Sequence, residues 1–396
     1  MDTVRGTDPE NVTGVDFDAV IERRNTDSLK WDVYADDVLP MWVADMDFVS
    51  PDAVIRALRE RVNHGVFGYS RHASRLPELI VERLATLYDW HVSPEAIVFL
   101  PGIVNGFNVA TRAFVATDEA VMIQTPVYMP ILHAAHDAGV QGQGMALTRD
   151  EDGRYVIDFE QFESTITDRT RMFLLCNPHN PVGRVFTREE LHRMAEICLR
   201  RDVLICSDEI HCDLVFSGSR HTPIAGLNPE VEARTVTLMA PSKTFNIAGL
   251  HCGFAVIPDA ELRRRYKEGR GGLVGSPNLM GYVAAEAAYA EGQPWLDALL
   301  RYLEGNRDVI TSFVRAHMPE LKVTPLEGTY LAWIDCREAN LPQSPTTYFL
   351  ERGKVAFSDG AAFGPGGEGF IRLNFGCPRS LLLEGLERMR RALASR

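Results

Sequence analysis

The sequence predicts an α/β protein of two domains, with a mostly parallel sheet covered by helices in the larger one. The chain has 396 residues, whereas a single hydrophobic core stops growing at roughly 250–300 residues. From residue 49 to residue 290, short apolar runs alternate with amphipathic stretches, as the strands and helices of a parallel sheet do. From residue 291 to residue 396, a long helical pattern leads into separated strands and a terminal helix, which indicates a smaller α+β domain.

Residues 1–48 precede this alternation, and we expect them to form an N-terminal arm that contributes to the small domain. They contain a short helical pattern around Asp16–Arg24 and an apolar stretch, Leu39–Asp45. The large domain then opens with a helix, for which Ser50 is the expected N-cap and Pro51 the expected first residue.

The apolar runs and the amphipathic stretches give the expected elements of both domains. The predicted strands of the large domain are Ile97–Leu100, Ala120–Gln124, Arg171–Cys176, Asp202–Ser207, Thr235–Met239 and Gly253–Ile257. The predicted helices between or after them are Asn105–Val115, Arg188–Arg201 and Pro277–Ala290. In the small domain we expect a helix, Pro294–Met318, and the strands Tyr330–Asp335 and Phe370–Asn374.

Composition excludes several classes of function. The net charge of −13 argues against nucleic-acid and anionic-membrane partners, because both require basic patches. The N-terminus has no apolar signal core, and no run approaches the roughly 18 apolar residues of a membrane span, so we expect a cytoplasmic protein. The seven cysteines form no Cys-x-x-Cys pair and are expected to be reduced. No metal is expected at His211-Cys212-Asp213, since adjacent strand side chains point to opposite faces.

Polar segments follow two of the predicted strands, where a parallel sheet places its ligands. The turn Pro101-Gly-Ile-Val-Asn-Gly106 leads into a helix, whose first N–H groups could bind a phosphate; an ordinary strand–helix turn is the alternative. The stretch Asn177-Pro-His-Asn-Pro-Val-Gly183 is made rigid by its two prolines. Its Asn side chains must find partners locally or in a ligand.

Two ionisable side chains also follow predicted strands. Asp208 comes at the end of a buried strand and needs a cationic partner, which a protonated ring nitrogen could be; a helix N-cap or a salt bridge is the alternative. Lys243 comes two residues after Pro241, which ends another strand. Partial desolvation would lower its pKa and make the neutral amine a nucleophile toward an aldehyde. The alternative is a solvated loop lysine.

Taken together, these segments resemble a known family. The segments Asn177–Gly183, Ser207-Asp-Glu-Ile-His211 and Ala240–Leu250, in this order and spacing, resemble the fold-type I pyridoxal-phosphate enzymes of the aminotransferase class I/II superfamily. The most similar branch is the cystathionine β-lyase-like C–S lyases of the MalY/PatB type. Further stretches that resemble this branch are Leu39–Phe48, Glu327–Trp333 and Phe363–Phe375. The resemblance implies a mostly parallel seven-stranded sheet between helices, with a smaller α+β domain.

The resemblance also implies pyridoxal 5′-phosphate as the cofactor and a homodimer with shared active sites. Lys243 would join the cofactor aldehyde and then move the Cα proton, and Asp208 would pair with the ring nitrogen. Arg372 would bind the substrate α-carboxylate through its guanidinium; an Arg paired with an internal acid is the alternative. The resemblance further implies that Asn180 and Ala44 contact the substrate, and that Asn180 and His211 contact the cofactor 3′-oxygen. Tyr128 would stack on the ring face, and the phosphate would be bound by Gly102, Ile103, Val104 and Ser242. Tyr69 would be a further catalytic residue that reaches the phosphate of the neighbouring subunit.

One glycine-rich segment requires a different interpretation. Gly364-Pro-Gly-Gly-Glu-Gly369 satisfies the G-x-G-x-x-G dinucleotide pattern, but the following Phe370–Asn374 is predicted as a strand and offers no helix N-terminus. A Rossmann dehydrogenase is therefore not expected. We interpret the segment as a mobile loop, or a lid, beside Arg372.

The expected reaction is α,β-elimination from an L-cysteine S-conjugate, cystathionine-like or bulkier, to thiol, pyruvate and ammonia. Lys243 and Asp208 would equally serve an aminotransferase, or a decarboxylation-coupled oxidative deaminase acting on a sulfur-linked amino acid in secondary metabolism. A third hypothesis is a protein that binds a transcription factor. The segments 69–76, 103–107 and 128–133, which would line the substrate mouth, contain departures from the branch and favour a bulky or specialised S-conjugate. His251 stands where many relatives place Lys or Arg, which puts one phosphate contact in question.

Overall fold

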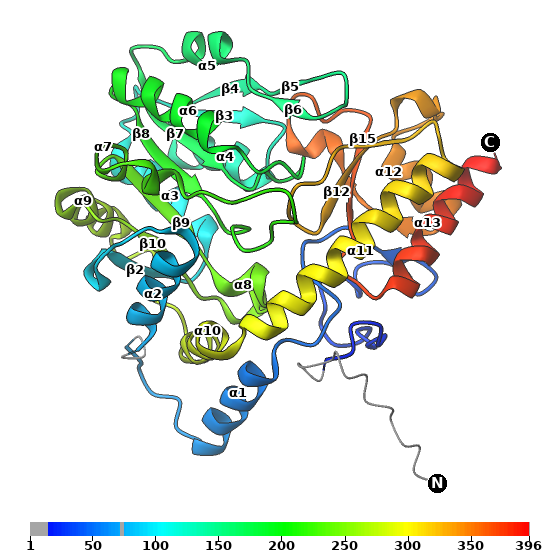
Figure 1. Cartoon of the computed structure of the whole chain (residues 1–396), viewed down its shortest axis with the longest axis horizontal. Helices are drawn as coiled ribbons and strands as arrows, with labels where there is room; N and C mark the ends of the chain where they lie inside the picture. Colours follow the sequence, from blue (N-terminus) through cyan, green and yellow to red (C-terminus); the bar gives the residue numbers. More distant parts are fainter. Residues whose placement is uncertain (1–14, 72–74, 396) are drawn as a thin grey trace.

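The computed structural model describes residues 15–71 and 75–395, and its largest element is a seven-stranded sheet (Figure 1). The strands lie in the order β2-β10-β9-β8-β7-β3-β4. Their bounds are β2 Ile97–Leu100, β3 Ala120–Thr125, β4 Gln141–Ala146, β7 Thr170–Cys176, β8 Leu204–Asp208, β9 Thr235–Met239 and β10 Gly253–Val256. The predicted α/β class is confirmed.

The direction of the strands decides where a ligand can bind. Neighbouring strands from β9 to β4 pair in parallel, and only β10 runs antiparallel, to β9 and to β2. Because β10 reverses direction between β9 and β2, the carboxyl ends of β2, β7, β8 and β9 all lie at the same edge of the sheet. Open α/β sheets bind ligands at this edge.

Helices cover both faces of the sheet, and each face has a separate hydrophobic core. One face packs against α3 (Ile103–Phe114), α4 (Met129–Ala138) and α9 (Ala260–Arg270), and the other against α5 (Phe159–Thr165) and α6 (Arg188–Arg200). Helix α3 lies close to β9 because residue 106 is glycine: a Cβ there would come within 2.8 Å of Leu238. This close approach places the N-terminus of α3 beside the ends of the central strands.

A second, antiparallel sheet is built from the C-terminal part of the chain. Its strands lie in the order β11 (Lys322–Val323), β12 (Leu331–Asp335), β15 (Phe370–Asn374) and β14 (Ser358–Asp359). The remaining main helices are α1 Asp52–His64, α2 Leu76–Tyr88, α10 Leu279–Glu291, α11 Gln293–His317 and α13 Arg379–Ala394. The arm packs on this part through β1 (Leu39–Pro40), which pairs with β13 (Val355–Ala356), and through Phe17 and Trp31 in the shared core.

Two expectations for the N-terminal part are wrong. Asp16–Arg24 forms turns and irregular chain instead of a helix, because Arg23 and Arg24 bind carboxylates and main-chain carbonyls elsewhere in the arm. Ser50 does not cap α1; its hydroxyl donates to the Asn246 carbonyl at 3.0 Å, and Pro51 occupies the N-cap position.

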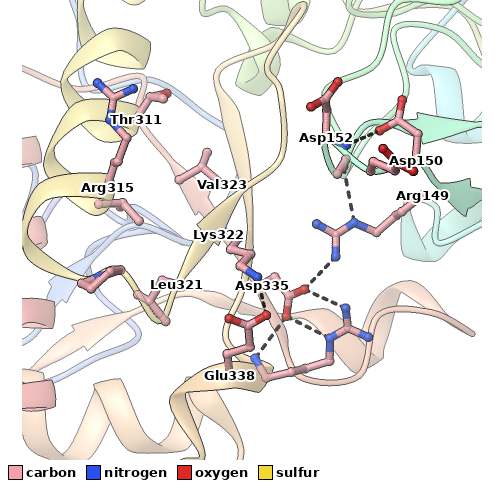
Figure 2. Close-up of a pocket in the computed structure, with 15 residues that line it drawn as sticks. Arg149, Asp150, Asp152, Thr311, Arg315, Leu321, Lys322, Val323, Asp335 and Glu338 are labelled. Carbon is pink, nitrogen blue, oxygen red and sulfur yellow. Dashed lines mark hydrogen bonds and ion pairs between the residues drawn. The ribbon is translucent and has the colours of Figure 1, made fainter.

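A charged cluster, shown in Figure 2, ties the four-stranded sheet to a separate two-stranded sheet of β5 (Thr148–Arg149) and β6 (Tyr155–Val156). Arg149, in β5 (Thr148–Arg149), donates to Asp335 at 2.7 Å, and Arg337 donates to the same carboxylate at 2.7 Å. Burial opposes ionisation of Asp335, but the bonds from Arg337 and Arg149 outweigh it and hold the pKa of Asp335 below its ordinary value. The carboxylate therefore stabilises the fold as an anion that bridges two parts of the chain.

We expect Asp335→Asn to destabilise the protein by about 2 kcal/mol near neutral pH, since the hydrogen bonds to a charged acceptor lose most of their strength. The lowered pKa means that the wild-type advantage is present above the unfolded-state pKa of this carboxyl and disappears as the pH falls through the folded-state value. Urea unfolding of both proteins at several pH values measures this. A difference that persists unchanged into strong acid would contradict the assignment.

Candidate active site

A cavity of about 370 Å³ opens where the carboxyl ends of β2, β7, β8 and β9 meet the second sheet and the arm. All of the predicted site residues except Tyr69 line it. These are Ala44, Gly102, Ile103, Val104, Tyr128, Asn180, Asp208, His211, Ser242, Lys243 and Arg372. Residues from seven separate segments of the sequence thus come together in one cavity.

Lys243 lies on the four-residue helix α8 (Pro241–Thr244), directly after β9. Its amino group donates to the main-chain carbonyl of Ala44 at 2.6 Å. Burial lowers the pKa of Lys243 to about 8, with a contribution from Arg372, while Asp45 and Asp208 oppose the shift. The alternative of a solvated loop lysine is wrong, because this amine is desolvated and partly neutral near pH 7.

Asp208 is the last residue of β8 and is 4% exposed. Its carboxylate accepts the Ile210 N–H at 3.1 Å, and in the part of the chain that the structure describes it forms no ion pair. Burial, and to a lesser extent Glu209, raise the pKa of Asp208 to about 7, against the influence of Lys243. A carboxylate in this environment is stabilised by any cationic group that enters the cavity.

Arg372 lies on β15 and is 3% exposed. The acceptors that the described residues offer it are all uncharged: Asn180 Oδ1 at 3.0 Å, the Trp42 carbonyl at 2.9 Å and Ser358 Oγ at 3.1 Å. Its Nε has no partner among the described residues, and burial lowers the pKa of Arg372 to about 10. The alternative of an internal acid is wrong, and the guanidinium fits an incoming carboxylate.

Three further residues line the wall between these charges. His211 is buried, which together with Lys243 and Arg372 lowers its pKa to about 3, and its Nδ1 has no partner among the described residues. The side-chain oxygen of Asn180 accepts a hydrogen bond from Arg372, and its main-chain carbonyl accepts the Tyr128 N–H at 3.0 Å. The unpaired His211 nitrogen leaves room for a ligand with a polar oxygen.

Another part of the cavity lining, at the N-terminus of α3, is suited to an anion. Gly102 precedes α3, so the first N–H groups of this 12-residue helix, at Ile103 and Val104, have no partner within the helix. Ser242 from α8 lines the same cavity. His251 also lines it, in a left-handed conformation with φ 51°, so the residue that departs from the expected Lys or Arg does lie at the site.

Tyr69 is not brought into the cavity of its own chain. It lies between α1 and α2, in a segment without helix or strand, and is fully exposed; Val66 and Phe67 in the same segment are also largely exposed. Residues 72–74 of the divergent segment 69–76 lie outside the described residues. An exposed run of apolar and aromatic side chains is typical of a surface that meets another molecule.

Several residues of the site had no role assigned from the sequence. Trp42 and Ser358 line the cavity and surround Arg372, and the Tyr330 hydroxyl donates to the Ala44 carbonyl at 2.8 Å. Trp42 and Tyr330 belong to the segments Leu39–Phe48 and Glu327–Trp333, so the resemblance indicated their neighbourhood. As expected, Gly364–Gly369 leads into the strand β15, and no helix follows it.

The sequence profile of the aminotransferase class I and II family matches residues 36–389. The chain belongs to this family. It is 41% identical to cystathionine beta-lyase PatB of Bacillus subtilis, over 96% of this chain and all of the relative. Among solved structures it is similar to OvoB (TM-score 0.92, 45% identity, 96% of this chain and 100% of that chain). It is also similar to cystalysin of Treponema denticola, which contains pyridoxal 5′-phosphate (TM-score 0.92, 33% identity, 96% and 99%).

The described residues contain neither a candidate membrane-spanning helix nor a candidate metal site. No helix there is long and apolar enough to span a bilayer. No group of three or more His, Cys, Asp and Glu side chains within residues 15–71 and 75–395 could hold a metal ion.

The raised pKa of Asp208 predicts that this carboxylate destabilises the cofactor-free protein. An unfolded Asp releases its proton near 3.8 and the folded one near 7, so the folded state binds more protons in this window and stability falls as pH rises through it. We expect cofactor-free Asp208→Asn to be more stable than wild type at pH 8, on the order of 2–4 kcal/mol, and similar to it near pH 4. Urea unfolding measures both; equal stability at pH 8 would contradict the burial argument.

Proposed function

We propose that the protein is a pyridoxal 5′-phosphate-dependent C–S β-lyase, which converts an L-cysteine S-conjugate into thiol, pyruvate and ammonia. One observation carries the proposal: a single cavity combines the desolvated amine of Lys243, the buried carboxylate of Asp208 and the guanidinium of Arg372 with no charged partner. The named activity of PatB and the cofactor of cystalysin support the choice of lyase and cofactor.

The residues of the cavity fit this cofactor. Asp208 suits a protonated ring nitrogen, the unpaired His211 Nδ1 and Asn180 suit a phenolic oxygen, and the N-terminus of α3 suits a phosphate. Tyr128, whose pKa burial raises, lies in the same wall and suits the ring face. When bound, the cofactor supplies an electron sink conjugated to the substrate amino group.

Each of the three charged residues then has a distinct task. Arg372 binds the substrate α-carboxylate and orients Cα, because a guanidinium fork matches a carboxylate. Lys243 takes the proton from Cα, for which the neutral amine favoured by its lowered pKa is required. Asp208 keeps the proton on the ring nitrogen. The electrons left at Cα then expel the thiolate from Cβ.

The choice between elimination and its alternatives depends on the substrate. The wall formed by Trp42, Val43 and Met129 carries no charge, which suits the carbon atoms next to the sulfur of a cysteine conjugate. Family membership equally allows transamination, and decarboxylation-coupled deamination uses the same three residues. Binding of a transcription factor alone would not require an amine, a carboxylate and a guanidinium on one cavity.

We also propose that the protein acts as a homodimer in which Tyr69 of one chain reaches the phosphate site of the other. The support is the full exposure of Tyr69, Val66 and Phe67 on a segment that makes no contribution to the cavity of its own chain.

The reaction is tested by incubating the holoenzyme with small and bulky cysteine S-conjugates, cystathionine included. We expect equal amounts of pyruvate and thiol, with the best conversion for a bulky conjugate. Lys243→Ala should abolish turnover and prevent borohydride from fixing the cofactor to the chain, whereas the exposed Lys267→Ala should change neither. If the product is a keto acid that retains sulfur, the reaction is transamination and not elimination. If carbon dioxide is released together with an aldehyde, the reaction is decarboxylation-coupled oxidative deamination.

The shared site is tested by mixing two inactive variants, Lys243→Ala and Tyr69→Ala. In a hybrid dimer with shared sites, one site carries both substitutions and the other carries neither. Random mixing in equal amounts should therefore restore about a quarter of wild-type activity, because half of the dimers are hybrids with one intact site. If each site used its own Tyr69, mixing would restore nothing.

A further inference from the structure

Four consecutive main-chain carbonyls of the arm, from Trp42 to Asp45, accept hydrogen bonds from side chains, three of which (Lys243, Ser358 and Arg372) line the cavity. We refer to these four groups as the carbonyl row. Arg372 Nη2 and Ser358 Oγ donate to Trp42, Asn374 Nδ2 donates to Val43 and Asp45, and Lys243 Nζ and Tyr330 Oη donate to Ala44, at distances of 2.6–2.9 Å.

The donors to the carbonyl row come from both sheets. Lys243 follows β9 of the seven-stranded sheet, whereas Arg372 and Asn374 lie on β15 of the four-stranded sheet. Residues 42–45 belong to no helix or strand, so, apart from a main-chain bond from the Asp45 N–H to the Val43 carbonyl, side-chain hydrogen bonds hold their carbonyls in place. The position of the carbonyl row therefore fixes the Lys243 amine relative to the Arg372 guanidinium.

Arg23 holds the carbonyl row at its C-terminal end. Its two terminal nitrogens donate to Asp45 Oδ2 at 2.7 Å and to Asp47 Oδ1 at 2.6 Å, and it also contacts the Met46 carbonyl and Ser28. Asp47 has a second cation, Lys30, at 2.6 Å. Among the described residues, Asp45 forms an ion pair with Arg23 alone. Its other carboxylate oxygen, Oδ1, is buried and has no hydrogen-bond partner among these residues.

The charge of Asp45 acts on Lys243 across one residue of the carbonyl row. Asp45 directly follows Ala44, whose carbonyl receives the Lys243 amine, and its carboxylate opposes the lowering of the pKa of Lys243. The other groups around this amine are Asp208, which also favours the charged form, and Arg372, which disfavours it. His211 and the Tyr330 hydroxyl are uncharged at neutral pH. Arg23 thus offsets one of the two anions close to Lys243.

We propose that Arg23, which lies outside the cavity, is a positioning residue that controls the charge balance at Lys243 by holding and neutralising Asp45. This rests on the proposed role of Lys243 in binding the cofactor, and it adds a residue of the arm to the machinery of the site. Arg23 acts through Asp45 and the carbonyl row and touches neither cofactor nor substrate.

The test is a pH titration of the visible absorbance of the holoenzyme, whose cofactor band changes when the nitrogen shared with Lys243 is protonated. We expect Arg23→Gln to move the midpoint upward by about one pH unit, since Asp45 is then uncompensated. Asp45→Asn should move the midpoint downward. The double variant should lie within about 0.3 units of the wild-type midpoint, since both opposing charges of the pair are then absent.

Arg24→Gln is the matched control, because Arg24 binds the carbonyls of Trp31, Asp36 and Val38 instead of Asp45. Its midpoint should stay at the wild-type value. Shifts of the same sign in Arg23→Gln and Asp45→Asn, or no shift in Asp45→Asn, would overturn the proposal and leave Arg23 with a structural role only. If Arg23→Gln fails to fold, Arg23→Lys, which keeps the charge, must retain the midpoint while Asp45→Asn lowers it. A wild-type protein without any cofactor band would instead refute the proposed function itself.

Discussion

The constraint on which the site depends is the desolvation of three charged groups in one cavity. Lys243, Asp208 and Arg372 are removed from water without forming ion pairs with one another, and burial is the largest influence on the pKa of each. A buried charge costs several kcal/mol unless other groups stabilise it. A cation beside Asp208, an anion beside Arg372 and an electrophile at the Lys243 amine would each lower the free energy of the cavity. A bound cofactor and substrate together would supply all three.

The rest of the fold holds these three charged side chains at fixed positions. Separate hydrophobic cores on the two faces of the seven-stranded sheet fix the strand ends that carry Asp208 and Lys243. Arg372 is fixed from another direction, by the four-stranded sheet and by Phe363, whose ring lies 4.8 Å from the guanidinium carbon. The Arg149–Asp335 bond also ties this four-stranded sheet to β5, which lies in the two-stranded sheet (Figure 2).

Local sequence was sufficient to predict the residues at strand ends and insufficient for residues held by distant partners. Asp208 and Lys243 follow buried strands, and the carboxyl ends of parallel strands must meet, so their convergence could be predicted. Strand β4 was missed because Gln141-Gly-Gln-Gly carries few apolar residues at a sheet edge. The Asp16–Arg24 pattern resembled a helix, but bonds from Arg23 to Asp45 and Asp47 override it. The domain boundaries at residues 48 and 290 and the role of Tyr69 stay predictions.

The carbonyl row also explains how reacting side chains can move without leaving unsatisfied acceptors behind. The Ala44 carbonyl accepts from both Lys243 and Tyr330, and the Trp42 carbonyl accepts from both Arg372 and Ser358. An orphaned carbonyl in the wall of a cavity costs about 1–3 kcal/mol. Because Tyr330 and Ser358 remain as donors, Lys243 can leave Ala44 to react, and Arg372 can turn toward a carboxylate, without that cost. The arm thus holds the Lys243 and Arg372 side chains in an arrangement from which they could be released at low free-energy cost.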